Sequence, residues 1–376
     1  MFRKHFDFLK WCLINLPGWR THRKIVVIES DDWGSIRTPS LEVYKTLVKK
    51  GFRLDKLAYN RYDSLESEDD LRLLFEVLHN VKDKTGNPAI ITANTIVGNP
   101  DFDKIRESNF KEYYWEPFIE TMKRYPCHEN SYYLMKEGIK RRLYKPQFHG
   151  REHLNVKRWM KSLQENSGNM RTAFDFRMYD LSESVRISEN SFMEAFNLRS
   201  EVELAFQKDS ISEGLALFEQ IFGFRSSSFI APCYTWSRSL NETLLSGGVT
   251  ILQGNYFQLE PRIGDKHKFK RIIHFTGQKN SLGQVYLVRN AAFEPSQAPD
   301  FNFIEEILRR GNIAFGLGKP LIIGSHRLNY IGSIDQKNRD RNLLLLSRLL
   351  HSIVTRWPDV EFMSSDELGV LIKDSN

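Results

Sequence analysis

The stretch Lys24–Gly34, KIVVIESDDWG, decides the fold of this chain. Its first five residues, Lys24–Ile28, form a β-branched run that is typical of a strand. Two adjacent carboxylates, Asp31 and Asp32, follow this run within a few residues. We therefore predict a strand that delivers a pair of acidic side chains near its carboxyl end.

The remainder of the chain alternates between strand and helix patterns. Further strands are predicted at 89–95, 147–149, 228–231, 249–253, 284–288, 321–324 and 360–363, and helices near 40–50 and at 201–222, 237–245, 301–310 and 337–356. Segment 254–280 is predicted as a solvated loop or hairpin. Strands that alternate with helices over this length indicate parallel β/α packing, either a barrel or a doubly wound sheet.

Composition excludes several classes of protein. With 376 residues, 41% of them hydrophobic, the chain can bury one large α/β domain with insertions or two ordinary domains. Three cysteines without C-x-x-C spacing exclude a disulfide framework and a zinc ribbon, and they favour the reducing cytoplasm. No apolar run approaches the roughly 20 residues that span a bilayer.

The surplus of positive charge lies at the N-terminus. Residues 1–24 contain six Lys and Arg against one Asp, so they carry +5 of the net +7. Phe2, Phe6, Leu9 and Leu13 recur at helical spacing, which predicts an amphipathic helix within residues 1–20. Such a helix fits two roles equally: peripheral contact of residues 1–16 with the inner membrane face, or docking on the main domain.

Two features of the same region limit the function. The apolar stretch at 11–16 is short and is broken by Pro17-Gly18, which argues against a secretion signal and favours a cytoplasmic protein. The nearly neutral remainder offers no obvious basic face, so nucleic acid is not expected as a partner.

Polar residues cluster after three predicted strands. Asp31 and Asp32 follow the first, His149 and His153 follow strand 147–149, and His326 follows strand 321–324. Each has an ordinary structural explanation, such as a helix cap, a chance His-x-x-x-His pair or a hydrogen-bonded histidine. Together they point to a site, because sites of parallel β/α folds assemble at the carboxyl ends of strands.

The chemistry of this set is coherent. Two histidines four apart and one carboxylate can bind a divalent ion and leave positions open for water. A second carboxylate can accept a proton from that water, and a separate histidine can protonate a leaving group. Zn²⁺ is favoured by these ligands, although nickel, cobalt and iron also accept them.

In their order along the chain, these motifs resemble those of the polysaccharide deacetylase family, the NodB-like carbohydrate esterases of family 4, over roughly residues 24–330. Glu29–Trp33 is similar to the family motif Thr-Phe-Asp-Asp-Gly, and His149 with His153 to its His-x-x-x-His motif. The resemblance implies a distorted (β/α) barrel. It also implies that Asp31 is the general base and that Asp32, His149 and His153 are metal ligands.

Two later motifs match more loosely. Ile230–Tyr234 approaches the family's Arg-x-Pro-Tyr, which implies an oxyanion donor at the Tyr234 N–H and a place for Pro232 in the substrate cleft. Gly324-Ser325-His326 approaches Leu-x-His, which implies His326 as general acid.

The departures from the family pattern concern the substrate cleft. Trp33 replaces a glycine of the first motif and is expected to contact substrate. Ile230 stands where the family has an arginine that orients the base, and Arg225, Arg171 or Arg289 is hypothesised to supply that charge. No aspartate-rich fourth motif is found. Asn290 and Glu294 are candidate substitutes near the substrate, with Glu294 given slightly more weight as a capped-loop residue.

We therefore expect an amphipathic helix at residues 1–20, followed by a single barrel domain at 21–376 with a helical insertion at 101–145. The leading hypothesis is a metal-dependent deacetylase acting on an amino sugar in a glycan or glycan precursor. Other C–N bond hydrolysis on the same barrel is a nearby alternative. A second alternative is a catalytically silent barrel that binds glycan or protein, because the family arginine and fourth motif are missing. Oligomeric state is left open.

Overall fold

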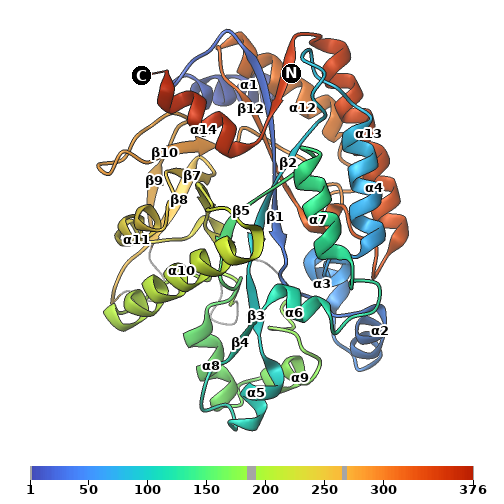
Figure 1. The fold of residues 1–376 in the computed structure, drawn as a ribbon, viewed down its shortest axis with the longest axis vertical. Coiled ribbons are helices and arrows are strands. Elements are labelled where there is room, and N and C mark those ends of the chain that lie inside the picture. The colour runs from blue at the N-terminus through green and yellow to red at the C-terminus, as the bar shows by residue number, and fades with distance from the viewer. Residues whose placement is uncertain (1, 184–191, 265–268, 376) are drawn as a thin grey trace.

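The computed structural model describes residues 2–183, 192–264 and 269–375 (Figure 1). Within them, a nine-stranded parallel sheet forms the centre of the molecule. Its strands are β1 (Lys24–Trp33), β2 (Ile91–Ile96), β5 (Tyr144–Gly150), β6 (Ser228–Ile230), β7 (Ile251–Gly254), β10 (Val285–Val288), β11 (Ala291–Ala292), β12 (Leu321–His326) and β13 (Val360–Met363). Each strand predicted from the sequence is present, with its ends shifted by a few residues.

The sheet is curled, and the chain that joins its two edge strands brings those edges together. Its order is β10-β7-β6-β5-β2-β1-β12-β11, with β13 beside the start of β1. The edge strands β10 and β11 are separated in sequence only by Arg289 and Asn290, which reach at most about 11 Å. The Arg289 N–H donates to Gly254 of β7 at 3.0 Å, and the Asn290 N–H to Ile322 of β12 at 3.0 Å. These two residues thus form a seam between the sheet edges, and the predicted distorted barrel is confirmed.

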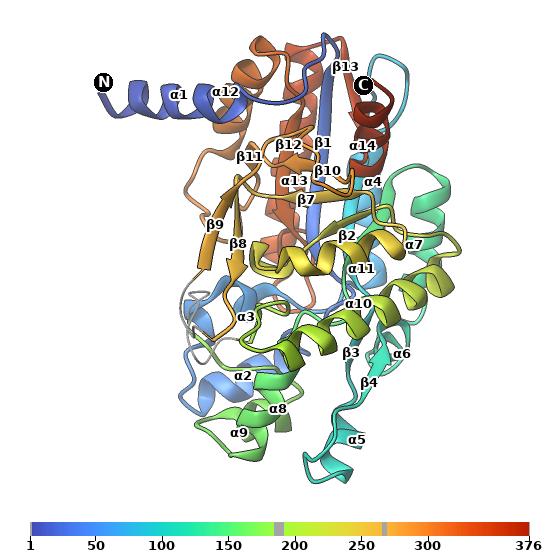
Figure 2. The ribbon, with the colours of Figure 1, turned by 90° about the vertical axis from the view of Figure 1, so that its left-hand side faces the viewer.

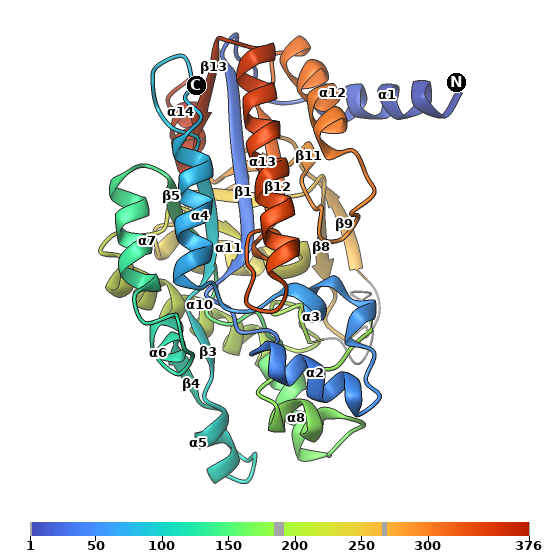
Figure 3. The same ribbon diagram turned by 90° about the vertical axis from the view of Figure 1, so that its right-hand side faces the viewer.

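Helices cover the outside of the sheet. The main ones are α4 (Glu68–His79), α7 (Ser131–Lys140), α10 (Glu201–Phe222), α11 (Asn241–Ser246), α12 (Phe303–Gly316), α13 (Gln336–Arg356) and α14 (Ser365–Asp374). The helices α13, α4 and α7 lie side by side along one flank (Figures 1 and 3). Their buried leucines and the apolar strand residues form one core, since both faces of a parallel sheet must be covered.

Local sequence fixes where these helices begin and end. Ser67 and Asp70 form a capping box at the start of α4. Ser200 caps α10, and Gly223, with φ of 79°, ends it in the left-handed conformation that glycine adopts without strain. The helix α10 therefore begins and ends at the residues predicted from the sequence, 201 and 222.

Smaller elements surround the mouth of the barrel. They are α2 (Leu41–Lys49), α3 (Ala58–Tyr62), α5 (Phe102–Glu107), α6 (Phe118–Met122), α8 (Val156–Gln164), α9 (Met170–Asp175), the 3₁₀ turns at Leu54–Lys56, Pro232–Tyr234, Arg238–Leu240 and Arg327–Asn329, and the hairpins β3 (Gly98–Pro100) with β4 (Trp115–Pro117) and β8 (Phe257–Pro261) with β9 (Phe269–Ile273). The hairpin predicted within 254–280 is thus present. The last helix of segment 101–145, α7, packs on α4 and β5 as part of the barrel's helical layer.

The N-terminal helix α1 (Phe2–Asn15) projects from the body of the molecule beside α12 (Figure 2). The guanidinium of Arg310 lies 3.2 Å from the centre of the Trp11 ring, which attaches the helix to α12. Leu9, Leu13 and Leu16 are 57%, 67% and 50% exposed, so an apolar stripe remains uncovered. No helix in the described part of the chain is long and apolar enough to cross a membrane.

Candidate active site

A cavity of about 260 Å³ opens among the carboxyl ends of the strands. Six of the residues selected from the sequence line it: Asp31, Asp32, His149, His153, Tyr234 and His326. They come from β1, β5, β12 and the turns after β5 and β6. Because parallel strands present all their carboxyl ends at one end of a barrel, residues nearly 300 positions apart in sequence share one cavity.

Asp32, His149 and His153 converge on one point. The Asp32 Oδ1 lies 3.4 Å from His149 Nε2 and 3.2 Å from His153 Nε2. Ligand atoms of the three side chains lie within 4.8 Å of one another, and all three residues are buried. At Asp32, φ is 77°, a left-handed conformation that interrupts the regular alternation of β1.

The hydrogen bonding of these residues fits a bound cation. His149 Nδ1 lies 2.8 Å from the Ile230 carbonyl oxygen, so it carries the proton and leaves a lone pair on Nε2. Among the described residues, Asp32 Oδ1 and His149 Nε2 are buried without a hydrogen-bond partner. Buried polar atoms are seldom left unsatisfied, and here their lone pairs face one another as metal ligands do. Although burial opposes it, His153 and His149 hold the pKa of Asp32 well below its usual value.

Asp31 is held by Arg289 from the seam. The guanidinium donates from Nη1 to Asp31 Oδ2 at 2.8 Å and from Nη2 to Oδ1 at 2.7 Å, and from Nε to Glu29 at 2.7 Å. Asn94 of β2 also donates to Asp31 Oδ1 at 2.7 Å. Burial alone would raise the pKa of Asp31, but the adjacent Arg289 outweighs it and lowers the pKa to about 2. Asp31 is thus an oriented, ionised carboxylate.

His326 lies across the cavity from Asp31. Its Nδ1 lies 2.6 Å from Glu294 Oε1, and its Nε2 lies 3.8 Å from Asp31 Oδ2. The ring of Tyr59 packs edge-on against it at 5.3 Å between ring centres. Burial alone would lower the pKa of His326, but the Glu294 carboxylate outweighs it and raises the pKa to about 10. His326 therefore carries a proton on each ring nitrogen at neutral pH, and Nε2 faces the cavity.

The three arginines that could supply the charge beside Asp31 have different partners in the structure. Arg225 forms an exposed pair with Glu219, and Arg171 donates to the Leu163 carbonyl. Only Arg289 among them contacts Asp31.

Glu294 and Asn290 have different hydrogen-bond partners, and these partners reverse the order in which the sequence ranked the two residues. Glu294 contacts His326, whereas the Asn290 amide bonds to Asn15, Pro320 and Ile322. Asn290 therefore closes the seam. Of the two candidates, Glu294 is the one that contacts the histidine, and the spacing of residues after β10 does not reveal which side chain turns inward.

Three further expectations are corrected. Trp33 is 1% exposed, donates to Ser30 and packs on Tyr144 in the core, so it does not line the cavity. Pro232 is the buried first residue of the 3₁₀ turn and is also absent from the cavity wall. The Tyr234 N–H already donates to Ala231 at 3.0 Å within this turn, so it is not free to bind an oxyanion. Tyr234 does line the cavity, and its hydroxyl accepts a hydrogen bond from Arg289 at 3.0 Å.

Several cavity residues were not found from the sequence. Arg37, Tyr59 and Asp63 line the cavity wall from the segment between β1 and α4. Asn94 bridges Asp31 and Gln253. Asn94 lies in a predicted strand, and its position near that strand's carboxyl end is the signal that could have identified it.

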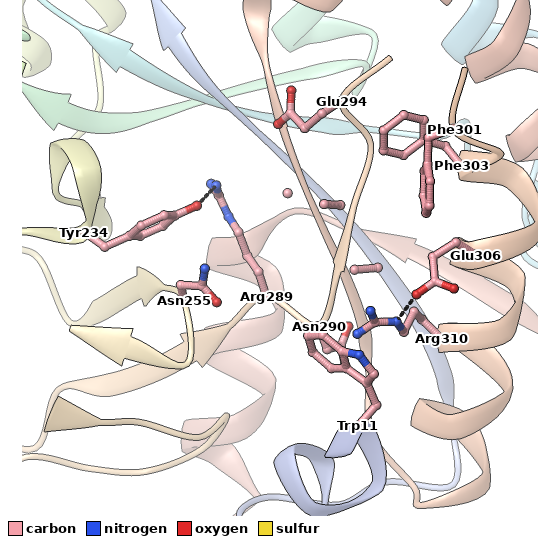
Figure 4. Close-up of a pocket in the computed structure, with 13 residues that line it drawn as sticks. Trp11, Tyr234, Asn255, Arg289, Asn290, Glu294, Phe301, Phe303, Glu306 and Arg310 are labelled. Carbon is pink, nitrogen blue, oxygen red and sulfur yellow. Dashed lines mark hydrogen bonds and ion pairs between the residues drawn. The ribbon is translucent and has the colours of Figure 1, made fainter. Parts of the chain in front are cut away.

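A second cavity, of about 320 Å³, adjoins the first (Figure 4). Tyr234, Arg289 and Glu294 line it on the side of the active site, and Trp11 and Arg310 on the side of α1. The hydrogen bond between Tyr234 and Arg289 therefore forms part of its wall.

No family model and no curated protein matches the sequence. The fold is similar to several solved structures. A 4-alpha-glucanotransferase from Thermococcus litoralis aligns with 8% identity and a TM-score of 0.46 over 93% of this chain, which spans 40% of that protein's length. A putative polysaccharide deacetylase from Mycobacterium smegmatis aligns with 11% identity and a TM-score of 0.45, over 96% of this chain and 93% of that one. A probable polysaccharide deacetylase from Pseudomonas aeruginosa aligns with 8% identity and a TM-score of 0.45, over 93% and 90%.

Proposed function

We propose that this chain is a metal-dependent hydrolase that removes an N-acetyl or related acyl group from an amino sugar of a glycan or glycan precursor. The observation that carries the proposal is the convergence of three buried ligand side chains, Asp32, His149 and His153, next to an ionised carboxylate and a protonated histidine. A metal site flanked by one base and one acid can hydrolyse an amide.

Each group has a distinct role in this proposal. A divalent metal, Zn²⁺ in the first instance, held by the three ligands would acidify a nearby water and polarise the amide carbonyl. Asp31 takes the proton of the attacking water. Since its pKa is held near 2, Asp31 is a weak base that stays ionised and releases the proton readily between turnovers. Arg289 fixes both of its oxygens and thereby aims them.

Collapse of the tetrahedral intermediate needs a proton on the departing amine. His326 supplies it from Nε2, while Glu294 holds Nδ1 and stabilises the imidazolium. The Tyr234 hydroxyl accepts from Arg289, so its own proton is available to the developing oxyanion. This hydroxyl takes the role that the sequence assigned to the Tyr234 N–H.

The alternative of a catalytically silent barrel was based on the missing family arginine and fourth motif. Arg289 and Glu294 make contacts of the kind those residues would make, which supports catalysis over binding alone. Other C–N hydrolysis would use the same groups, so the activity assay should include an amide that is not a sugar beside the N-acetylated sugar.

The test combines metal content with acetate release. Asp32→Ala and His149→Ala are expected to lose bound zinc and acetate release together, and Asp31→Asn to keep the metal but lose activity. His351→Ala is the matched control, because this histidine is exposed and hydrogen-bonds only to its own helix. Full metal stoichiometry in both ligand variants would refute the site. Activity of Asp31→Asn equal to that of the unmodified protein would refute the assigned base.

A further inference from the structure

Arg37 is held rigidly in the loop between β1 and α2. The amide of Ile36 donates to Asn99 at 2.9 Å, and Thr38 donates from its amide to Asp63 and from its hydroxyl to Asn60, at 3.1 and 2.8 Å. The backbone is therefore fixed on both sides of Arg37. Its side chain lines the active-site cavity and is only 7% exposed.

The other charged side chains that line the cavity have counter-charges. Asp31 pairs with Arg289, His326 with Glu294, and Asp63 with Arg327 at 3.0 Å. Asp32 belongs to the proposed metal site.

Arg37 differs from these groups. Within the described ranges, no carboxylate lies within ion-pair distance of it, its Nε is buried without a hydrogen-bond partner, and Nη1 contacts only the Met193 thioether sulfur, at 2.6 Å. A thioether is a weak acceptor and carries no charge.

A buried guanidinium without an anion destabilises the folded protein. A bound ligand that supplies the anion removes this destabilisation. The flat face of Tyr59 lies beside Arg37, with 5.8 Å between the guanidinium carbon and the ring centre, and the same ring packs on His326. Arg37 and the proposed acid His326 thus both contact Tyr59 and line the same cavity. A substrate whose amide faces His326 would place a neighbouring part of its ring near Arg37.

We propose that Arg37 binds an anionic substituent, a carboxylate or a phosphate, on the amino sugar whose acyl group this site removes. The inference rests on the proposed function and narrows it to acidic or phosphorylated amino sugars. A planar guanidinium pairs with two oxygens of either anion in parallel, which gives both affinity and orientation. The cavity, at about 260 Å³, suits a single sugar residue more than a long polymer segment.

The experiment measures binding separately from turnover. Calorimetric titrations of the full chain, both zinc-loaded and metal-free, would use three probes: N-acetylglucosaminuronate, N-acetylglucosamine 1-phosphate and neutral N-acetylglucosamine. At least one anionic probe is expected to bind more tightly than the neutral sugar, and the two anionic arms identify which anion is recognised. Arg37→Gln should weaken binding of that probe roughly 10- to 100-fold, and Arg37→Lys should weaken it less.

Arg53→Gln is the matched control, since Arg53 is exposed and pairs with Asp55 outside the cavity; it should bind all probes as the unmodified protein does. Equal affinity for charged and neutral probes would overturn the inference. So would a lowered melting temperature of Arg37→Gln with undiminished anion binding, because Arg37 would then serve only as a counter-charge to Asp63. Arg37-dependent anion binding without acyl release would instead refute the proposed function and leave the anion site standing.

Discussion

Replacing Arg289 by Gln tests the centre of the site. In the structure, Arg289 is 6% exposed and makes four hydrogen bonds of 2.7 to 3.0 Å to Glu29, Asp31 and Tyr234. Glutamine is shorter than arginine and carries no charge, so Arg289→Gln leaves two buried carboxylates without their cation. Removing one partner of a buried ion pair typically costs about 3–5 kcal/mol. A protein near the middle of the usual range of about 5–15 kcal/mol remains folded after such a loss.

The loss of stability in Arg289→Gln should depend on pH, and the structure determines the direction of this dependence. Without Arg289, burial raises the folded-state pKa values of Glu29 and Asp31 above those of the unfolded chain. Protonation then stabilises the folded variant, so its stability falls as pH rises from about 4 towards those raised values. Urea denaturation at pH 5 and pH 8 should therefore show the larger deficit at pH 8.

Activity should fall as well, because Asp31 loses both its orientation and its charge. We expect kcat/KM for acetate release to drop about 100-fold or more. Arg289→Lys keeps the charge but not the two-pronged contact, so it should recover stability better than activity. Arg225→Gln, which removes an exposed pair of the same type, is the control and should change stability by less than about 1 kcal/mol. An Arg289→Gln variant that matches this control in both measurements would refute the reasoning.

Three further predictions concern neighbouring features. Glu294→Gln should let the pKa of His326 fall from about 10 towards its ordinary value. The kcat/KM of this variant should then decline as pH rises above neutrality, where the unmodified protein stays active. An unchanged pH profile would contradict the His326–Glu294 pair. Gly324→Ala places a Cβ 2.6 Å from Arg289 Cδ, and it should cost about 1–3 kcal/mol and lower activity without altering any reacting group; normal activity would mean that Arg289 has room to move. Leu13→Glu puts a charge on the exposed apolar stripe of α1. If residues 1–16 contact membranes, this variant should sediment with anionic liposomes less than the unmodified chain does. Equal sedimentation would leave docking on α12 as the role of α1.

The sequence by itself determined the strands of the central sheet other than β11, several of the helices, and the residues at the strand ends. The β-branched run at Lys24–Ile28 can hardly form anything other than a buried strand, and apolar periodicity is a local property that the tertiary fold seldom overrides when it is strong. Asp31, Asp32, His149, His153 and His326 could be selected for the same reason. Their distance from the ends of predicted strands is a short count along the chain.

Only the tertiary structure decided which partners these residues meet. Arg289 follows β10, at one edge of the sheet order, and it reaches Asp31 on the central strand β1 because the barrel closes at the seam. Glu294 reaches His326 because β11 pairs in parallel with β12, and Trp33 turns into the core although Asp32 beside it lines the cavity. Closure of a curled sheet depends on the summed twist of all its strands and on side-chain packing across them, and no local window of sequence contains that sum. Arg37 shows the same limit: its spacing in the chain resembles that of many surface arginines, and only the packed cavity leaves it buried without an anion.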